Sequence, residues 1–482
     1  MGIKEKLNKA SVLYKQKKFD SANEILKKLL KKNPKLFDAL QLMALTLHGM
    51  KRFDEAIELF NKVITKNPQH VESVNNLANV YSDMGQLKLA ESTYLKAINI
   101  NNAYGDALNN LANVQRKLGD YIGAEKNYNK AVLCEPSKAE YYLNLGVLFS
   151  ERGLFELALN VQLKVLELDP SQSIVYFHIF NNFMFLHRYQ DALEFADLGL
   201  INHQLNDFQL CELLIGKAIL FWLSGNDDEG LEALALSEMI HRINSENINL
   251  KNHRVFHNLL KYLYRYRQTN RQVYEANELP TIYFISESHG FSANGITVEH
   301  ENEKHKIKSL FITGAKIFHF TKNDEHKCKA SLNVLLSNLP KGSTLALGFG
   351  EIDCRINEGV LKYSVKYNKN PLSIIDDMLE KYIAILNNAA SLREYSLIIY
   401  GVPSPHPLVV EGLTKEQAEE FKNLVFHFNH QLYLQCKKSE IPFLDVYKLT
   451  NNNGVSNLKY HNDYVHVKPE TLPKLFELLS EV

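Results

Sequence analysis

Two rhythms of apolar residues divide the chain near Leu279. Before this point, apolar residues recur at helical spacing in pairs of segments joined by short polar turns. Beyond it, short apolar runs alternate with longer helical patterns, which is typical of strands that alternate with helices. The pattern therefore predicts an all-α half followed by an α/β domain, in which helices cover both faces of a parallel five-stranded sheet.

A period of 34 residues runs through the first half of the chain. Two series of small residues and one series of large apolar residues keep this interval, and prolines close most of the units. Small residues at fixed places allow two helices to cross closely, and a proline stops the second helix of a pair. The three series are Ala22, Ala56, Ala90, Ala124, Ala158 and Ala192; Ala10, Ala44, Ala78, Ala112 and Gly146; and Phe19, Phe53, Leu87, Tyr121, Phe155 and Tyr189.

This period resembles the tetratricopeptide repeat (TPR) over roughly residues 3–206. A degenerate seventh unit at about 207–244 extends the predicted array (1–244), and a capping helix with a linker fills residues 245–279. The resemblance implies a concave groove that holds a peptide or another protein. Four asparagines are expected to face it, because an amide can pair with a peptide backbone; the alternative is that they serve packing or solvation. They are Asn75, Asn79, Asn109 and Asn113.

The second half, residues 280–482, is expected to place its chemistry at one edge of the sheet. In parallel sheets, ligands bind beyond the carboxyl ends of the strands, and the candidate polar residues fall after strands or in late loops. A capping box of Thr414 and Gln417 opens one helix. The expected strands are Thr281–Ser286, Ser309–Thr313, Thr344–Gly348, Ser396–Gly401 and Pro442–Val446, and the expected helices are Pro371–Leu392, Thr414–Lys438 and Pro469–Leu479.

Two short motifs stand at opposite ends of this domain. Ser286-Glu287-Ser288 closes the first strand, and Asp463-Tyr464-Val465-His466 lies near the C-terminus. With a glycine after the second strand and a Gly-rich acidic loop after the third, they resemble the SGNH (GDSL-like) hydrolases. Those enzymes are esterases and acyl hydrolases with a flavodoxin-like sheet, and they need no metal or other cofactor.

The resemblance implies a role for each of three residues. Ser288 would be the nucleophile, with its backbone N–H in the oxyanion hole; His466 would be the general base, and Asp463 would orient it. A serine hydroxyl is a poor nucleophile until a base removes its proton, so the chemistry requires this arrangement. Gly314, after the second strand, would add a backbone donor to the oxyanion hole.

The third motif departs from the family pattern of Gly-x-Asn-Asp. In Gly348-Phe349-Gly350-Glu351-Ile352-Asp353-Cys354-Arg355 the asparagine is replaced by Ile352 or Gly350, depending on the register. Losing one oxyanion donor typically costs roughly a hundred- to a thousand-fold in rate. The loop nevertheless offers further pocket residues. Arg355 either supplies positive charge or is bound structurally by Glu351 and Asp353.

His289 follows the serine directly in sequence and is therefore not positioned to act as its general base, so we expect it in the pocket wall. Cys354 has no histidine near it in sequence, and a buried thiol is its expected state.

Composition limits the classes of partner and the compartment that are expected for the chain. The 482-residue chain has 55 basic and 55 acidic residues, so charge favours no nucleic-acid or anionic-membrane partner. It has no apolar run of about 18 residues, so no membrane span is expected. The five cysteines form neither a disulfide framework nor a zinc spacing, which favours a reducing cytoplasm and no metal.

The sequence thus favours a TPR-guided serine esterase, acyl hydrolase or acyltransferase. The resemblance to the SGNH hydrolases allows carbohydrate O-acetyl groups, lipids or acyl thioesters as substrates. The alternative is a non-catalytic scaffold with a degenerate SGNH-like domain, which the missing asparagine and Glu287 in place of aspartate favour. The intact Asp463 and His466 count against that alternative.

Overall fold

A computed structural model of the chain shows two compact units. One comprises Met1–Phe149 with Glu156–Gln172, and the other Ser150–Phe155 with Ser173–Val482. Residue 244, at the end of the predicted array, and parts of the predicted linker, residues 245–250 and 275–277, lie outside the described residues. In the part of the chain that the structure describes, no helix is long and apolar enough to cross a membrane. The described residues are 2–201, 205–243, 251–274 and 278–480.

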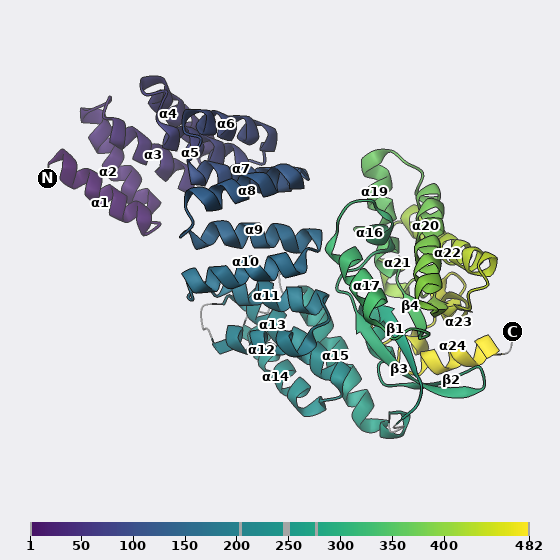
Figure 1. Ribbon diagram of the computed structural model, residues 1–482. Helices are drawn as coiled ribbons and strands as arrows, with labels where there is room; N and C mark the ends of the chain where they lie inside the picture. Colours follow the sequence, from purple (N-terminus) through teal and green to yellow (C-terminus); the bar gives the residue numbers. More distant parts are fainter. Residues whose placement is uncertain (1, 202–204, 244–250, 275–277, 481–482) are drawn as a thin grey trace. The chain divides into compact units, whose positions relative to one another are not determined.

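The first half consists of antiparallel helix pairs, as the 34-residue period predicts (Figure 1). The alanines of the two small-residue series are fully buried, which confirms that they occupy the helix crossings. The helices are α1 (Ile3–Lys15), α2 (Phe19–Lys32), α3 (Phe37–Gly49), α4 (Phe53–Lys66), α5 (Val71–Asp83), α6 (Leu87–Ile100), α7 (Gly105–Leu118), α8 (Tyr121–Cys134), α9 (Ala139–Arg152), α10 (Phe155–Leu168), α11 (Ile174–Phe185) and α12 (Tyr189–Ile201).

A seventh pair, α13 (Asp207–Ser224) and α14 (Asp227–Ile243), follows the array, and α15 (Lys251–Thr269) packs against it. Gly225 makes the turn between the two helices with φ +85°, a left-handed conformation that glycine adopts without strain. In the sixth unit Phe180 replaces the usual small residue. Gly216 of α13 makes room for it, since a Cβ there would lie 2.2 Å from the Phe180 Cζ.

The sheet is mixed and has six strands in the order β2-β3-β1-β4-β5-β6. Five strands are parallel; β2 pairs antiparallel with β3 at the edge. Without β2, the parallel strands follow the 2-1-3-4-5 order of doubly wound sheets. The strands are β1 (Thr281–Ser286), β2 (Thr297–His300), β3 (Glu303–Phe311), β4 (Thr344–Gly348), β5 (Ser396–Tyr400) and β6 (Phe443–Leu444).

Strand β2 and the first half of β3 escaped the sequence prediction. Their residues are mostly charged or polar and partly exposed, so they lack the apolar run that marks a buried strand. The predicted strand began at Ser309, whereas β3 begins at Glu303. An edge hairpin needs burial on only a few positions, which is why hydrophobic pattern alone did not reveal it.

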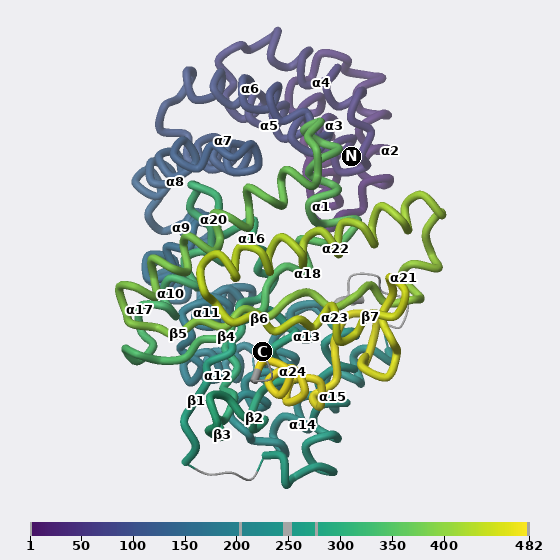
Figure 2. Tube along the Cα trace, turned by 90° about the vertical axis from the view of Figure 1, so that its right-hand side faces the viewer, coloured from purple at the N-terminus to yellow at the C-terminus, as the bar shows by residue number. Residues whose placement is uncertain are grey.

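Both faces of the sheet are buried, because alternate residues of each strand enter different cores. Ile285, Leu347 and Ile399 belong to the core beneath the helices of one face, and Phe284 and Ile398 belong to the core of the other. Figure 2 shows α20 and α22 side by side over the first face. The helices that cover the first face include α16 (Ile317–Thr321), α17 (Lys327–Asn338), α20 (Pro371–Arg393) and α22 (Lys415–Lys438). Helix α24 (Thr471–Ser480) covers the second face.

Helices α13 to α15 share a compact unit with the sheet. The indole N–H of the buried Trp222 donates to the carbonyl oxygen of Phe291 at 3.0 Å, and Arg267 stacks over the indole ring 3.4 Å from its centroid. Phe291 belongs to the 3₁₀ helix η3 (Ser288–Ala293), which follows β1. The last helices of the first half therefore support the turn at the end of β1.

Gly350, between β4 and the short helix α18 (Glu351–Cys354), is required by both conformation and packing. Its φ is +123°, and a Cβ at this position would lie 2.3 Å from the Phe428 ring. The loop after β4 can follow its path over α22 only with glycine at this point.

We expect Gly350→Ala to destabilise the sheet unit more than Gly342→Ala. Gly342 also has positive φ but nothing within 4 Å of a Cβ, so alanine there meets only the left-handed cost of about 1–2 kcal/mol. At Gly350 overpacking adds about 1–3 kcal/mol. Denaturant unfolding followed by fluorescence of Trp222, the only tryptophan, measures the difference. Equal losses would contradict the packing argument.

Candidate functional site

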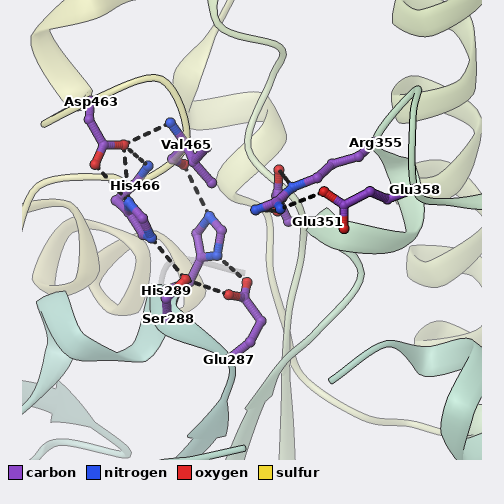
Figure 3. Close-up of polar contacts among 9 residues, drawn as sticks. All are labelled: Glu287, Ser288, His289, Glu351, Arg355, Glu358, Asp463, Val465 and His466. Atoms are coloured by element: carbon purple, nitrogen blue, oxygen red, sulfur yellow. Dashed lines mark hydrogen bonds and ion pairs between the residues drawn. The ribbon is translucent and has the colours of Figure 1, made fainter. Parts of the chain in front are cut away.

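The structure brings together three residues predicted from the two sequence motifs (Figure 3). His466 Nε2 lies 2.8 Å from Ser288 Oγ, although 178 residues separate them in the chain. Its other nitrogen, Nδ1, lies 2.8 Å from Asp463 Oδ2 and 3.0 Å from Asp463 Oδ1. Ser288 and His466 are buried, with 6% and 3% of their surface exposed. A hydroxyl, an imidazole and a carboxylate thus form a continuous chain.

The three-residue spacing of Asp463 and His466 positions the carboxylate locally. The backbone N–H groups of Val465 and His466 donate to Asp463 Oδ1 at 2.8 and 2.7 Å, which closes a tight turn. A bridge between His461 and Val467 and the bond from Asn462 N–H to the His466 carbonyl oxygen close the wider loop. The side chain of His466 therefore has one orientation, toward the end of β1.

Glu287 and His289 flank the serine and connect it to this loop. Ser288 Oγ lies 2.7 Å from Glu287 Oε2, and His289 Nδ1 contacts Glu287 Oε1. His289 Nε2 lies 3.0 Å from the carbonyl oxygen of Val465. The sequence suggested that His289 is a pocket wall; instead its ring is buried and links the turn after β1 to the loop that carries His466.

The charges of this buried cluster compensate one another. Burial disfavours the imidazolium form of His289, but the carboxylates of Glu287 and Glu351 outweigh burial and raise its pKa. Burial likewise opposes ionisation of Glu287, but attraction and hydrogen bonding from His289 dominate and lower the pKa of the carboxyl. The pKa of Asp463 is held below its usual range against the effect of burial, chiefly by hydrogen bonding to His466.

Arg355 is bound by two carboxylates, Glu351 and Glu358. Its Nε lies 3.0 and 2.9 Å from the two Glu351 oxygens, its Nη2 lies 2.8 Å from Glu351 Oε2, and its Nη1 lies 3.4 Å from Glu358 Oε1. Of the two roles expected for Arg355, the structure therefore shows the structural one, with Glu351 as its main partner.

Asp353, the other expected partner of Arg355, has a different role. Its oxygens accept the backbone N–H groups of Ile317 and Phe318 at 2.8 and 3.2 Å and cap α16. Burial raises the pKa of Asp353 to about 7 although these amides oppose the shift. Gly314 occupies the loop after β3 with φ +63°. Neither Gly350 nor Ile352, the two positions expected for the asparagine of the SGNH pattern, carries a side-chain donor.

A cavity of about 510 Å³ lies beside the buried cluster of Glu287, Ser288, His289 and His466. Glu351, Arg355 and Val465 belong to its wall, so it borders the residues that surround His289. Its remaining wall comes from the loops after β4 and β5, from α22 and from the loop of His466. That wall combines apolar and polar side chains: Val402, Val409, Leu413, Phe421 and Val425, with Ser404, His406, Gln417, His461 and Tyr464.

Two groups among the described residues have metal-ligand chemistry within 4.8 Å: Glu287, His289 and Glu351, and His319, His326 and Cys328. In the first, both nitrogens of His289 face oxygen acceptors, so no lone pair remains for a metal. In the second, His326 Nδ1 accepts the Cys328 N–H, and burial and nearby lysines lower the pKa values of both histidines.

The four predicted groove asparagines belong to a ladder of hydrogen bonds within and between repeats. Asn79 Oδ1 accepts from the Tyr94 hydroxyl at 2.5 Å, and Asn113 Oδ1 accepts from Tyr128 at 2.6 Å. Asn75 and Asn109, which are buried, accept from the next unit along through Asn110 and Asn144. The amide oxygens thus hold neighbouring helices together, which agrees with the packing alternative for these oxygens.

Comparisons with known proteins identify the first half. The family described as "Psidin, N-terminal TPR repeats region" matches residues 12–143, and "Tetratricopeptide repeat" matches residues 139–172. Together with the helix pairs, these matches establish a TPR array. No curated protein matches the sequence.

Solved structures of TPR proteins are also similar to this chain. A thermophilic TPR protein from Thermus thermophilus is 22% identical, with 38% of this chain and 98% of that chain covered and a TM-score of 0.34. A TPR protein from Parabacteroides merdae is 15% identical, covering 54% and 98%, with a TM-score of 0.40. YrrB, a TPR protein with an unusual peptide-binding site, is 18% identical, covering 39% and 94%, with a TM-score of 0.33.

Asp353→Asn is expected to change how stability depends on pH. The unfolded carboxyl has a pKa of about 3.9. The folded one, at about 7, keeps its proton between these values. The folded state then binds more protons than the unfolded state, so this group's contribution to stability falls as pH rises from about 4 to about 7. The stability of wild type minus that of the variant should therefore decrease from about pH 5 to about pH 8, measured by denaturant unfolding. The exposed Asp324→Asn is the control. For it, the stability of wild type minus that of the variant should show no such decrease over this pH range.

The asparagine ladder predicts coupling between Asn79 and Tyr94. Each of Asn79→Ala and Tyr94→Phe removes the same hydrogen bond, so the double variant should lose less stability than the sum of the two. The expected coupling is about 0.5–1.5 kcal/mol. Unfolding followed by helical circular dichroism measures it, and additive losses would show that the ladder does not stabilise the array.

Proposed function

We propose that the chain is a serine ester hydrolase or acyltransferase of the SGNH type, guided by a TPR array that binds a protein or peptide. The observation that carries the enzymatic part is the 2.8 Å contact between Ser288 Oγ and His466 Nε2, with Asp463 behind the imidazole. The strand order of the sheet supports the family resemblance as well.

In this proposal each residue has a defined role in acyl transfer. The Asp463 carboxylate accepts a hydrogen bond from Nδ1–H of His466, which leaves Nε2 free to take the Ser288 proton. Ser288 Oγ then attacks the acyl carbon, and the alkoxy group leaves with the proton carried by His466. Water, or an acceptor hydroxyl in a transferase, repeats these steps in reverse and frees the serine.

The oxyanion would be stabilised chiefly by backbone donors. Ser288 begins η3, and the first N–H groups of such a helix have no partner within it, so the Ser288 amide is available to an oxygen. Gly314, in the adjoining loop after β3, is the second proposed donor. Because the position of the family's asparagine has no amide side chain here, we expect a slower enzyme than one with three donors.

The cavity supports a small acyl ester as substrate. Its apolar wall suits an acyl group or the face of a sugar ring, and its polar side chains suit hydroxyl groups. Carbohydrate O-acetyl groups combine both properties, and lipid and thioester acyl groups fit the apolar part.

The TPR array supports recruitment of a protein or peptide. Repeats of this class present extended surfaces for such partners. The second candidate function is therefore a non-catalytic scaffold in which the array alone carries the activity. The missing oxyanion asparagine favours it, and the contacts that join Ser288, His466 and Asp463 favour the enzyme.

Hydrolysis of p-nitrophenyl acetate tests the proposal. We expect turnover by the wild-type chain, and a loss of roughly 10⁴-fold or more in kcat for both Ser288→Ala and His466→Ala, because the serine and its base act as one unit. Ser292→Ala is the matched control. Its hydroxyl is buried in the same 3₁₀ helix and makes no hydrogen bond within the described structure, so its removal should preserve turnover.

Absence of turnover in the wild type, or turnover indifferent to both substitutions, would favour the scaffold. Fluorescence of Trp222, which contacts η3, checks that each variant keeps the turn after β1 folded.

A further inference from the structure

The residues around Ser288 form five polar contacts in series. They join Val465 to His289, His289 to Glu287, Glu287 to Ser288, Ser288 to His466, and His466 to Asp463 (Figure 3). Each contact is a hydrogen bond only if one hydrogen lies between its two atoms. The number of available hydrogens therefore limits which contacts form at the same time.

His289 must carry a hydrogen on each nitrogen. The Val465 carbonyl oxygen can only accept, so His289 Nε2 donates to it. An ionised Glu287 can only accept as well, so His289 Nδ1 donates to Oε1. His289 is then an imidazolium paired with a carboxylate, which agrees with the raised pKa of His289 and the lowered pKa of Glu287.

Ser288 has one hydroxyl hydrogen and two neighbours that accept it. Glu287 Oε2 lies 2.7 Å from Ser288 Oγ, and His466 Nε2 lies 2.8 Å from it. With both carboxylates ionised and both histidines neutral, the five contacts share three hydrogens. For all five contacts to be hydrogen bonds, two more hydrogens are needed, one on His289 and one on the segment formed by Glu287, Ser288 and His466. Two carboxylates and two extra protons give a cluster with no net charge, as burial requires.

We propose that Glu287 competes with His466 for the Ser288 hydroxyl proton, so that the nucleophile is released only when this segment loses one proton. In the fully bonded state Ser288 donates to Glu287, and His466 donates Nε2–H to Ser288 Oγ. Loss of the His466 Nε2 proton to solvent lets the hydroxyl turn to His466, which then removes its hydrogen during attack. This deepens the proposed hydrolase and rests on it for the catalytic consequence.

The surrounding charges act on this equilibrium from several elements. Asp463 faces His466 from the same loop, and Glu351, bound to Arg355, faces His289 from α18. None of these lies within hydrogen-bond distance of Ser288, so Glu287 is the group that competes directly. Other titratable groups that act on the charge of this cluster, or feel it, include Arg355, Tyr400, His406 and His461.

Replacing Glu287 by glutamine tests the competition. A neutral amide is either a donor to Ser288 Oγ or a weaker acceptor than a carboxylate, so the hydroxyl turns to His466 more readily. Without the negative charge, His466 also holds its extra proton less tightly. We expect the acidic limb of the kcat/KM profile for p-nitrophenyl acetate to lie at least about one pH unit lower in Glu287→Gln than in wild type. At a pH below the wild-type limb, kcat/KM of the variant should then be roughly tenfold higher than that of wild type.

Glu351→Gln is the matched control, because it removes the same charge near His289 without touching Ser288. Its limb should move much less than that of Glu287→Gln. Equal shifts of the acidic limb in the two variants would indicate a general effect of negative charge instead of competition for the hydroxyl proton, and they would overturn the proposal. An unmoved limb with a uniformly lower rate in Glu287→Gln would assign Glu287 a packing role only and would also overturn it.

Side-chain ¹⁵N NMR of histidine separates this proposal from the proposed function, since it needs no turnover. We expect a doubly protonated imidazole at about pH 8, assigned to His289 by its absence in His289→Gln. At about pH 7, we expect a smaller fraction of His466 with a hydrogen on both nitrogens in Glu287→Gln than in wild type. Ser288→Ala should lower this fraction too, because the hydroxyl that connects His466 to Glu287 is gone.

These NMR results without esterase activity would retain the proton competition and reject the hydrolase. A neutral His289 at about pH 8, or an equal fraction of doubly protonated His466 in wild type and both variants, would overturn the competition whatever the esterase assay gives.

Discussion

The link between His289 and Val465 holds the site together, because it joins two segments that are 176 residues apart in the chain. One segment is the turn after β1, and the other is the loop before α24. A parallel sheet brings both to its carboxyl edge, but it does not by itself fix the distance between them. The imidazole of His289 closes the remaining distance and orients the loop that carries His466.

This link depends on charge that is almost completely removed from water. Isolated, either Glu287 or His289 would be costly to bury; as a hydrogen-bonded pair they compensate each other. The pair also lies against the serine, so the same groups that stabilise the turn influence the hydroxyl. Structural support and chemistry are therefore not separable at Glu287.

The helical half contributes to the site through its last helices. Trp222 of α13 donates to the Phe291 carbonyl oxygen, and Asn294 donates to the Trp222 carbonyl oxygen at 3.0 Å. The 3₁₀ helix that begins with Ser288 is thereby held by α13 as well as by the His466 loop. In the earlier repeats, alanines fill the helix crossings, asparagine–tyrosine bonds join the two helices of one unit, and asparagine–asparagine bonds join neighbouring units.

The sequence by itself determined the helix pairs, the five parallel strands and the two motifs that meet in the site. These follow from local pattern: a 34-residue period, apolar runs of strand length, and an Asp-x-x-His turn whose carboxylate is fixed by its own backbone. Only the tertiary structure decided the partners of Glu287, Asp353 and the groove asparagines, and revealed the polar edge strand β2. Those assignments depend on which buried donor faces which acceptor across long stretches of chain, and hydrophobic periodicity carries no information about that.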